Sequence, residues 1–230
     1  MDFKSHAVNK AWGFEAELYA NEKVSVWILN IKKGHATSLH LHPKKKTALI
    51  VLSGRVEISF LNSSVVVEAP YKCNIHPRVP HRTRALSDDV LLLESECPND
   101  KFDLVRIKDD YNREVYNYEG KKHYFPRPLG RLDPDDKWSM GQLGLSLTSL
   151  RRGTLEYVSP GSIYVITDGE CWYDKTTPII TLGDCIRGED LTSLVKDLDL
   201  TFAPNHNWLG VLRFSPPTVS REEVERLCTI

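Results

Sequence analysis

The sequence has no run of 18 apolar residues, no excess charge of either sign and no closely spaced cysteine pair. Thirty Lys and Arg stand against 31 Asp and Glu among 230 residues, which gives a formal net charge of −1. A balance of this kind provides no basic surface for nucleic acid or for an anionic membrane, so we expect neither partner. The absence of a long apolar run argues against a transmembrane helix.

Cysteine is scarce and scattered. The five cysteines are odd in number, and none forms a CxxC pair, which argues against a cysteine-based zinc finger and a disulfide scaffold. The first residues lack the apolar stretch of a secretory signal. We therefore expect a cytoplasmic protein with reduced thiols.

Short apolar runs separated by turn residues fill most of the chain. The first half contains Val24–Ile31, Ser38–His42, Ala48–Leu52, Val56–Leu61, Val65–Glu68 and Val90–Glu94. The second half contains Leu143–Leu150, Leu155–Val158, Ile163–Thr167, Cys171–Tyr173, Ile179–Leu182, Leu198–Phe202 and Leu209–Phe214. Such spacing predicts an all-β sandwich or barrel rather than βαβ units. Residues 98–137 are rich in charge, Tyr and Pro, and we interpret them as a connecting segment.

Two hairpins look like copies of each other. Residues 48–58 and residues 163–173 each contain an apolar strand, a tight turn that ends in glycine, and a second strand. This match indicates an internal duplication. Gly54 and Gly169 are expected to supply a positive φ in the two turns. The last residues, 217–230, predict a helix, because Ser220 and Glu223 form a capping box and Val224 and Leu227 form an apolar stripe.

Three histidines predict a metal site. Residues i and i+2 of a strand share one face, so His40 and His42 project together if Ser38–His42 is a strand. His81, within Pro80-His81-Arg82, can approach them from a neighbouring strand. Neutral imidazole is the commonest protein ligand of zinc, iron, nickel and copper.

These histidines lie inside a longer pattern. Gly34 is followed after five residues by His40-Leu41-His42, and Gly54 follows after eleven more. Together with the later stretch Ile75–His81, this pattern resembles the two signature motifs of the cupin superfamily. His40, His42 and His81 match the three histidine positions of the motifs. The sequence departs from the pattern at three positions: Thr47 replaces the glutamate ligand, and His76 and Arg78 replace a proline and a glycine.

The N-terminal stretch narrows the resemblance. Asn9–Glu15, followed by Val26–Gly34, resembles the beginning of the mannose-6-phosphate-isomerase-like cupins. The resemblance implies a double-stranded β-helix with a metal inside its mouth, and the duplication makes two tandem barrels. We expect a metal-binding barrel at 1–97, the connection at 98–137, a degenerate second barrel at 138–216 and the helix at 217–230. The ligand positions of the second barrel are Leu155, Tyr157 and Ser162, so that barrel should be metal-free.

Other residues near the predicted site have open roles. Thr47, Lys46 and Glu94 are candidates for binding a substrate. His76 either replaces the lost glutamate as a fourth ligand or lies on a turn and faces elsewhere. The run Lys44–Lys46 is more simply a solvated loop than an anion-attracting rim.

The leading functional hypothesis is a metal-dependent enzyme. His40, His42 and His81 would hold a divalent transition metal, namely Fe, Zn, Mn or Ni. By resemblance, the substrate is a phosphorylated or nucleotide-linked sugar that undergoes isomerisation or epimerisation in carbohydrate biosynthesis. The resemblance also implies a homodimer, or an equivalent interface within one chain.

Two alternatives stay open at this stage. The first is a three-histidine Fe(II) dioxygenase that acts on a small organic substrate, since Thr47 replaces the carboxylate ligand. The second is a non-catalytic sugar-binding or regulatory cupin.

Overall fold

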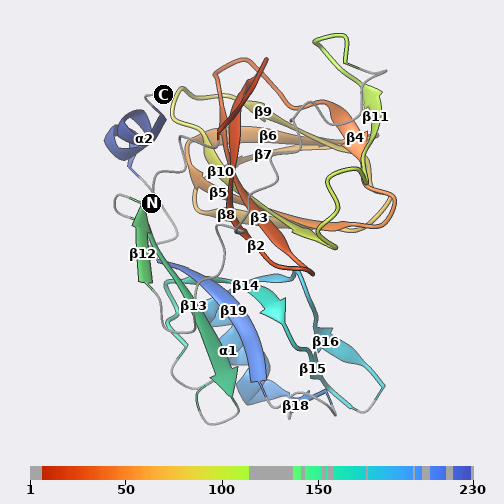
Figure 1. Ribbon diagram of the computed structural model, residues 1–230, viewed down its shortest axis with the longest axis vertical. Coiled ribbons are helices and arrows are strands. Elements are labelled where there is room, and N and C mark those ends of the chain that lie inside the picture. The colour runs from red at the N-terminus through yellow and green to blue at the C-terminus, as the bar shows by residue number, and fades with distance from the viewer. Residues whose placement is uncertain are drawn as a thin grey trace. The chain divides into compact units, whose positions relative to one another are not determined.

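The computed structural model describes residues 7–113, 137–140, 143–151, 154, 158–174, 176–198, 200–203, 208–215 and 220–228. The chain forms two compact units (Figure 1). The first contains residues 2–131 together with 218–230, and the second contains residues 132–217.

The first unit contains eleven described strands and one helix. They are β1 (Val8–Lys10), β2 (Gly13–Ala20), β3 (Ser25–Ile31), β4 (Leu39–Leu41), β5 (Lys46–Ser53), β6 (Arg55–Phe60), β7 (Ser64–Glu68), β8 (Tyr71–Ile75), β9 (His81–Ala85), β10 (Leu91–Cys97), β11 (Val105–Lys108) and α2 (Arg221–Cys228).

The strand order of this unit defines a jelly roll. One sheet has the order β1-β2-β3-β10-β5-β8 and the other has the order β11-β4-β9-β6-β7, with every pairing antiparallel. Numbered as eight consecutive strands, β3 to β10 therefore alternate between the sheets as 1-8-3-6 and 2-7-4-5. This is the arrangement of a double-stranded β-helix, so the predicted all-β fold is confirmed.

The interior of the first unit is apolar along one part of its strands and carries ionisable side chains along another. Side chains of Trp27, Leu29, Leu49, Val51 and Leu92 belong to one buried apolar cluster. Since alternate residues of a strand share a face, the next two inward positions on β10 after Leu92 are residues 94 and 96, and both are glutamates. The apolar part of the interior stabilises the barrel, and the ionisable part provides room for a polar site.

The second unit repeats this strand order. It contains β12 (Lys137–Met140), β13 (Leu143–Arg151), β14 (Ile163–Asp168), β15 (Cys171–Trp172), β16 (Pro178–Ile180), β17 (Cys185–Arg187), α1 (Gly188–Asp197), β18 (Thr201–Phe202) and β19 (Trp208–Ser215). Its larger sheet has the order β12-β13-β19-β14-β17, and its smaller sheet has the order β16-β15-β18. The orders β13-β19-β14-β17 and β16-β15-β18 correspond to β3-β10-β5-β8 and β7-β6-β9. The duplication that the two hairpins predicted thus extends to the sheet topology.

The structure describes one of the three ligand positions predicted for the second unit. Leu155 and Tyr157 lie outside the described residues. Ser162 is buried, and its hydroxyl accepts a hydrogen bond from Nε of Arg213 at 3.0 Å. Helix α1 follows β17 in a stretch for which the sequence predicted no element.

The glycines of the two matched hairpins adopt the same conformation. Gly54 has φ of +78° and Gly169 has φ of +77°, as predicted for these turns. At Gly169 an added Cβ would also lie 2.4 Å from the carbonyl oxygen of Trp208. Only glycine fits both requirements without strain.

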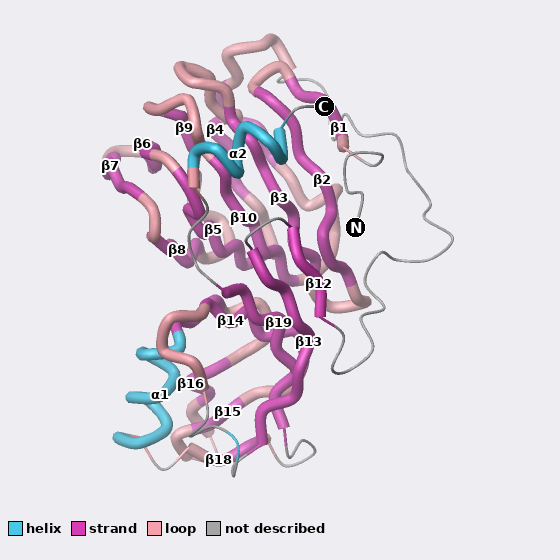
Figure 2. The backbone as a smooth tube through the Cα atoms, turned by 90° about the vertical axis from the view of Figure 1, so that its left-hand side faces the viewer, coloured by secondary structure: helices cyan, strands magenta, loops and turns pink. Residues whose placement is uncertain are grey.

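Two described segments outside the predicted first barrel, residues 98–113 and helix α2, belong to the first unit. Strand β11 pairs with β4, so the described part of the predicted connection, residues 98–113, extends one sheet of the barrel, whereas residues 114–136 lie outside the described chain. Figure 2 shows α2 against the strands of this unit. Its first turn includes a hydrogen bond from the amide of Val224 to the carbonyl of Ser220, which agrees with the predicted helix start. The side chains of Glu223 and Leu227 are not among those described.

Neither described helix has the length and the apolar character that crossing a bilayer requires.

The turn before β9 contains a strained residue. Arg78 has φ of +68°, and it occupies the position at which the resembling motif has glycine. Its amide donates a 2.7 Å hydrogen bond to the carbonyl of His42, which fixes the turn against the end of β4. A left-handed conformation costs a residue with a Cβ roughly 1–2 kcal/mol.

We predict that Arg78→Gly raises the free energy of unfolding by about 1 kcal/mol, because glycine accepts a positive φ although it gains entropy in the unfolded chain. Urea denaturation of the purified variant measures this change. Arg78→Ala is the matched control, since it removes the same side chain but keeps the Cβ, and it should give no gain. An equal gain in both variants would assign the effect to the guanidinium and contradict the strain.

Candidate metal centre

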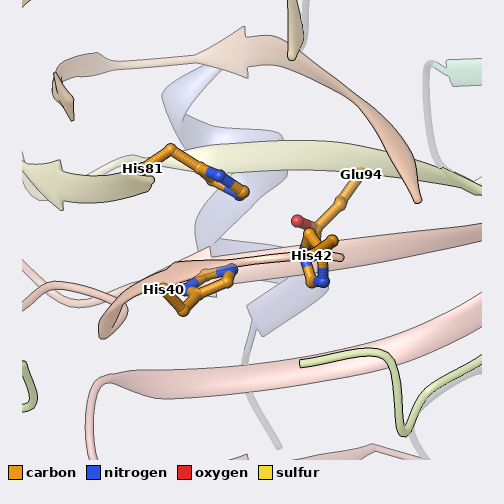
Figure 3. Close-up of side chains that lie close together, drawn as sticks. All are labelled: His40, His42, His81 and Glu94. Atoms are coloured by element: carbon orange, nitrogen blue, oxygen red, sulfur yellow. The ribbon is translucent and has the colours of Figure 1, made fainter. Parts of the chain in front are cut away.

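The three predicted histidines meet at one place inside the first unit (Figure 3). His40 lies on β4, His42 follows that strand directly, and His81 begins β9 as the register partner of His40. The ring centroids of His40 and His81 are 4.4 Å apart, and those of His40 and His42 are 5.0 Å apart. All three side chains are buried.

A fourth group joins them from β10. Ligand atoms of His40, His42, His81 and Glu94 all lie within 4.8 Å of one another. From the sequence, Glu94 was predicted only as a substrate-binding residue, and no carboxylate was predicted to replace the motif's glutamate. The sequence does contain a signal for this carboxylate: glutamates at the alternate positions 94 and 96 follow three leucines, so both share one face of the strand.

Backbone carbonyls orient the three rings. The Nδ1 of His40 donates to the carbonyl of Ser38 at 2.8 Å, and that of His81 donates to Val79 at 3.0 Å. The Nδ1 of His42 donates to the carbonyl of Asp103 at 2.6 Å. Because a carbonyl can only accept, each neutral ring carries its proton on Nδ1 and has a lone pair on Nε2.

Two of these lone pairs have no hydrogen-bond partner. Nε2 of His42 and Nε2 of His81 are buried and unsatisfied within the described chain. A buried polar atom without a partner is costly, and a metal ion satisfies such an atom directly. The donor set of three imidazoles and one carboxylate therefore fits a divalent transition metal.

Burial keeps the rings neutral. Burial is the largest cause that lowers the pKa of each histidine, and it lowers that of His42 to about 4, with Lys45 as the next cause. For His40 the pKa falls well below its ordinary value, with the neighbouring His81 and His42 adding to the effect of burial. The pKa of His81 is also lowered. Neutral imidazoles are the form that a metal binds, so the site does not have to lose protons near pH 7.

A buried network of ion pairs borders the histidines. Nζ of Lys45 lies 2.7 Å from Glu96, and Nζ of Lys101 lies 3.5 Å from the other oxygen of Glu96. Lys101 also lies 3.8 Å from Glu15, and Lys10 lies 3.5 Å from the same carboxylate. The Lys101 ammonium is 3.7 Å from the ring centroid of Trp27, a cation–π contact.

The two glutamates of β10 differ sharply in acidity. Burial raises the pKa of Glu94 to about 7, and the charge of Glu96 adds to the rise. Burial would also raise the pKa of Glu96, but Lys101 and Lys45 together lower it to about 2. Glu96 therefore stays ionised, while Glu94 is poised to change its charge near neutral pH.

Histidines and ion network line one cavity of about 70 Å³. Its wall includes five Lys or Arg side chains and three Glu side chains: Lys10, Lys45, Lys101, Arg106, Arg113, Glu15, Glu94 and Glu96. A cavity of this size holds several water molecules or the reacting end of a small molecule. It is well below the 300–1,000 Å³ or so of a pocket that encloses a drug-sized ligand.

The other predicted site residues lie elsewhere. Thr47 is buried, and its hydroxyl has no hydrogen-bond partner among the residues that the structure describes. Neither Thr47 nor the half-buried Lys46 lines the cavity. His76 is exposed on the turn before β9, away from the cluster, as the second of its two readings had it. The interpretation of Lys44–Lys46 as a solvated loop is wrong at Lys45, which is 1% exposed because its ammonium pairs with Glu96.

Some solved structures resemble part of this chain at low sequence identity. No protein-family model and no curated protein matches the sequence. Similar solved structures include KdgF from Halomonas sp., with 12% identity and a TM-score of 0.41 over 44% of this chain and 94% of that chain. An RmlC-like cupin from Shewanella frigidimarina has 17% identity and a TM-score of 0.38 over 40% and 83%. A protein with a double-stranded β-helix domain from Klebsiella pneumoniae has 13% identity and a TM-score of 0.39 over 44% of this chain and 90% of that chain. The assignment of the jelly roll rests on the strand order described above.

The acidity of Glu94 gives a prediction for the metal-free protein. Its carboxyl binds a proton near pH 7 in the fold but near pH 4.5 in the unfolded chain. Between these values the folded state holds more protons, so lowering the pH stabilises the fold through this group. Glu94→Gln removes the titration. The free energy of unfolding of the wild type, relative to the variant, should rise by as much as about 3 kcal/mol from pH 7 to pH 4.5.

Urea denaturation of both proteins across this pH range, with a chelator present, measures the difference. The titrations of the histidines occur in both proteins and cancel in the comparison. A difference that stays constant, or that falls as the pH is lowered, contradicts the raised pKa of Glu94.

Proposed function

We propose that the first unit binds one divalent transition metal through Nε2 of His40, His42 and His81 and the carboxylate of Glu94. The observation that carries this proposal is the pair of buried, unsatisfied Nε2 atoms of His42 and His81 in a cluster whose rings are turned by backbone carbonyls. A metal bound there would polarise a carbonyl or hydroxyl oxygen of a substrate as a Lewis acid.

We propose that the site acts on a small anionic sugar derivative, as an isomerase or epimerase. Positive side chains outnumber carboxyls on the cavity wall, five to three, which favours an acidic substrate. The volume admits only the reacting end of such a molecule, so a phosphate or nucleotide group would lie outside the cavity. Lys45 and Lys101 are each held by the ionised Glu96 and can donate hydrogen bonds to substrate oxygens from fixed positions.

The chain supplies two requirements of such a reaction. Moving a proton between neighbouring carbons needs the substrate oxygens anchored and bulk water kept out. Lys45 and Lys101 satisfy the first requirement, and the burial of the histidines satisfies the second.

The dioxygenase alternative loses the observation that motivated it. It followed from Thr47, which left three histidines and no carboxylate, whereas Glu94 brings a carboxylate to the cluster. The non-catalytic sugar-binding alternative makes the same demands on the cavity and is separated by experiment. The homodimer stays a prediction of the resemblance.

Metal content of the purified protein tests the first part of the proposal. We expect about one zinc, iron, manganese or nickel ion per chain in the wild type and loss of that ion in His42→Ala and in Glu94→Ala. His76→Ala is the matched control, since His76 is an exposed histidine outside the cluster, and it should retain the metal. A wild type that binds no metal even after reconstitution contradicts the proposal.

A matched set of sugars tests the second part. The metal-loaded protein is incubated with one sugar in neutral, carboxylate and phosphate forms, and products are resolved by chromatography. We expect isomerised or epimerised product from an anionic form and none from the neutral form. Oxygen uptake in place of isomerisation would favour the dioxygenase, and tight binding without product would favour a binding role.

A further inference from the structure

A residue outside the metal cluster, Asp103, contacts both His42 and the loop that follows His42. Asp103 lies 61 positions along the chain from His42 and is buried. Its backbone carbonyl accepts the 2.6 Å hydrogen bond from Nδ1 of His42. Its carboxylate oxygen Oδ2 accepts hydrogen bonds from the amides of Lys44 and Lys45, at 2.9 and 2.8 Å.

His42 differs from the other two histidines in how its ring is held. The rings of His40 and His81 donate to carbonyls only two residues earlier in the chain, so local backbone geometry fixes them. The carbonyl that holds His42 belongs to a distant segment. Its position depends on the docking of residues 98–113 against the end of β4.

The carboxylate of Asp103 supplies that docking at the point of contact. Two amide hydrogen bonds to one carboxylate oxygen are charge-assisted, and such bonds are stronger than those between neutral groups. These bonds tie Asp103 to Lys44 and Lys45, the second and third residues after His42. On its other side, the segment is continuous with β11, whose Val105 pairs with Leu41. The carbonyl of residue 103 is thus fixed from both directions.

We propose that Asp103 is a positioning residue of the metal site. Its carboxylate holds its own carbonyl against Nδ1 of His42, which keeps the proton on Nδ1 and aims Nε2 into the cluster. The same bonds fix the backbone of Lys45, whose ammonium pairs with Glu96 on the cavity wall. Asp103 thereby couples the aim of one ligand to the placement of a cavity lysine, and it acts only through these two residues.

This inference rests on the proposed metal site, and its test measures metal binding rather than activity. The variants are Asp103→Ala, which deletes both hydrogen bonds, and Asp103→Asn, which keeps a neutral acceptor oxygen. Asp100→Ala is the matched control, because the Asp100 side chain caps the amide of Phe102 in the same segment and is only half-buried. Dissociation constants for Zn²⁺ and Co²⁺ come from chelator competition, and the Co²⁺ absorption spectrum reports the ligand geometry.

We expect Asp103→Ala to weaken metal binding by about 10- to 100-fold and to change the Co²⁺ spectrum, since outer-shell partners typically have effects of this size. Asp103→Asn should recover part of the affinity, and Asp100→Ala should bind as the wild type does. Denaturation of the metal-free proteins shows whether each variant is folded.

The outcomes separate this inference from the proposed function. A wild type that binds neither ion overturns both. A wild type that binds both ions, with unchanged affinity and spectrum in a folded Asp103 variant, overturns the positioning role alone. If Asp103→Ala does not fold, Asp103→Asn decides: affinity and spectrum equal to those of Asp100→Ala count against the proposal.

Discussion

The site depends on a carboxylate that stays ionised inside the barrel. Burying Glu96 alone would cost several kcal/mol, and the structure offsets that cost with the ammonium of Lys45 at 2.7 Å and that of Lys101 at 3.5 Å. The ionised Glu96 affects both Glu94 and the two lysines on the cavity wall. Burial raises the pKa of Glu94, and the charge of Glu96 adds to the rise. The pairing of Glu96 with the two lysines fixes the cations that face the cavity. The pKa of Glu94 and the positions of the two lysines thus both depend on Glu96.

The barrel separates stability from chemistry along its own strands. On β10 the inward side chains change from Leu92 to Glu94 and Glu96 within five residues. The leucine packs in the apolar cluster, whereas the glutamates line the cavity. The ligands are thus buried inside the barrel, beside its apolar cluster.

Sequence patterns predicted the parts of this structure that are local in the chain. The i, i+2 spacing of His40 and His42 and the alternation within strands survive folding unchanged, because they depend only on strand geometry. The hairpin match at Gly54 and Gly169 reflects a turn that only glycine satisfies.

The parts that sequence patterns missed depend on contacts between distant strands. Glu94 joins the histidines only through the register of β10, and no spacing along the chain encodes that register. The hydrogen bond to the carbonyl of Asp103 is harder still to predict, since every residue type carries a carbonyl. Lys45 is charged and sits in a lysine run, so its burial follows only once Glu96 is placed beside it.

The same pairing explains why the carboxylate of the cluster comes from β10 and not from β5. Thr47, which holds the glutamate position of the resembling motif, is the register partner of Glu96. Directly opposed side chains on neighbouring antiparallel strands lie about 4.5–5.5 Å apart at Cβ, and like charges there destabilise the sheet. A glutamate at 47 would face an ionised Glu96 in a buried site. A neutral threonine avoids this repulsion, and Glu94, one inward position along the strand, supplies the carboxylate beside the three histidines.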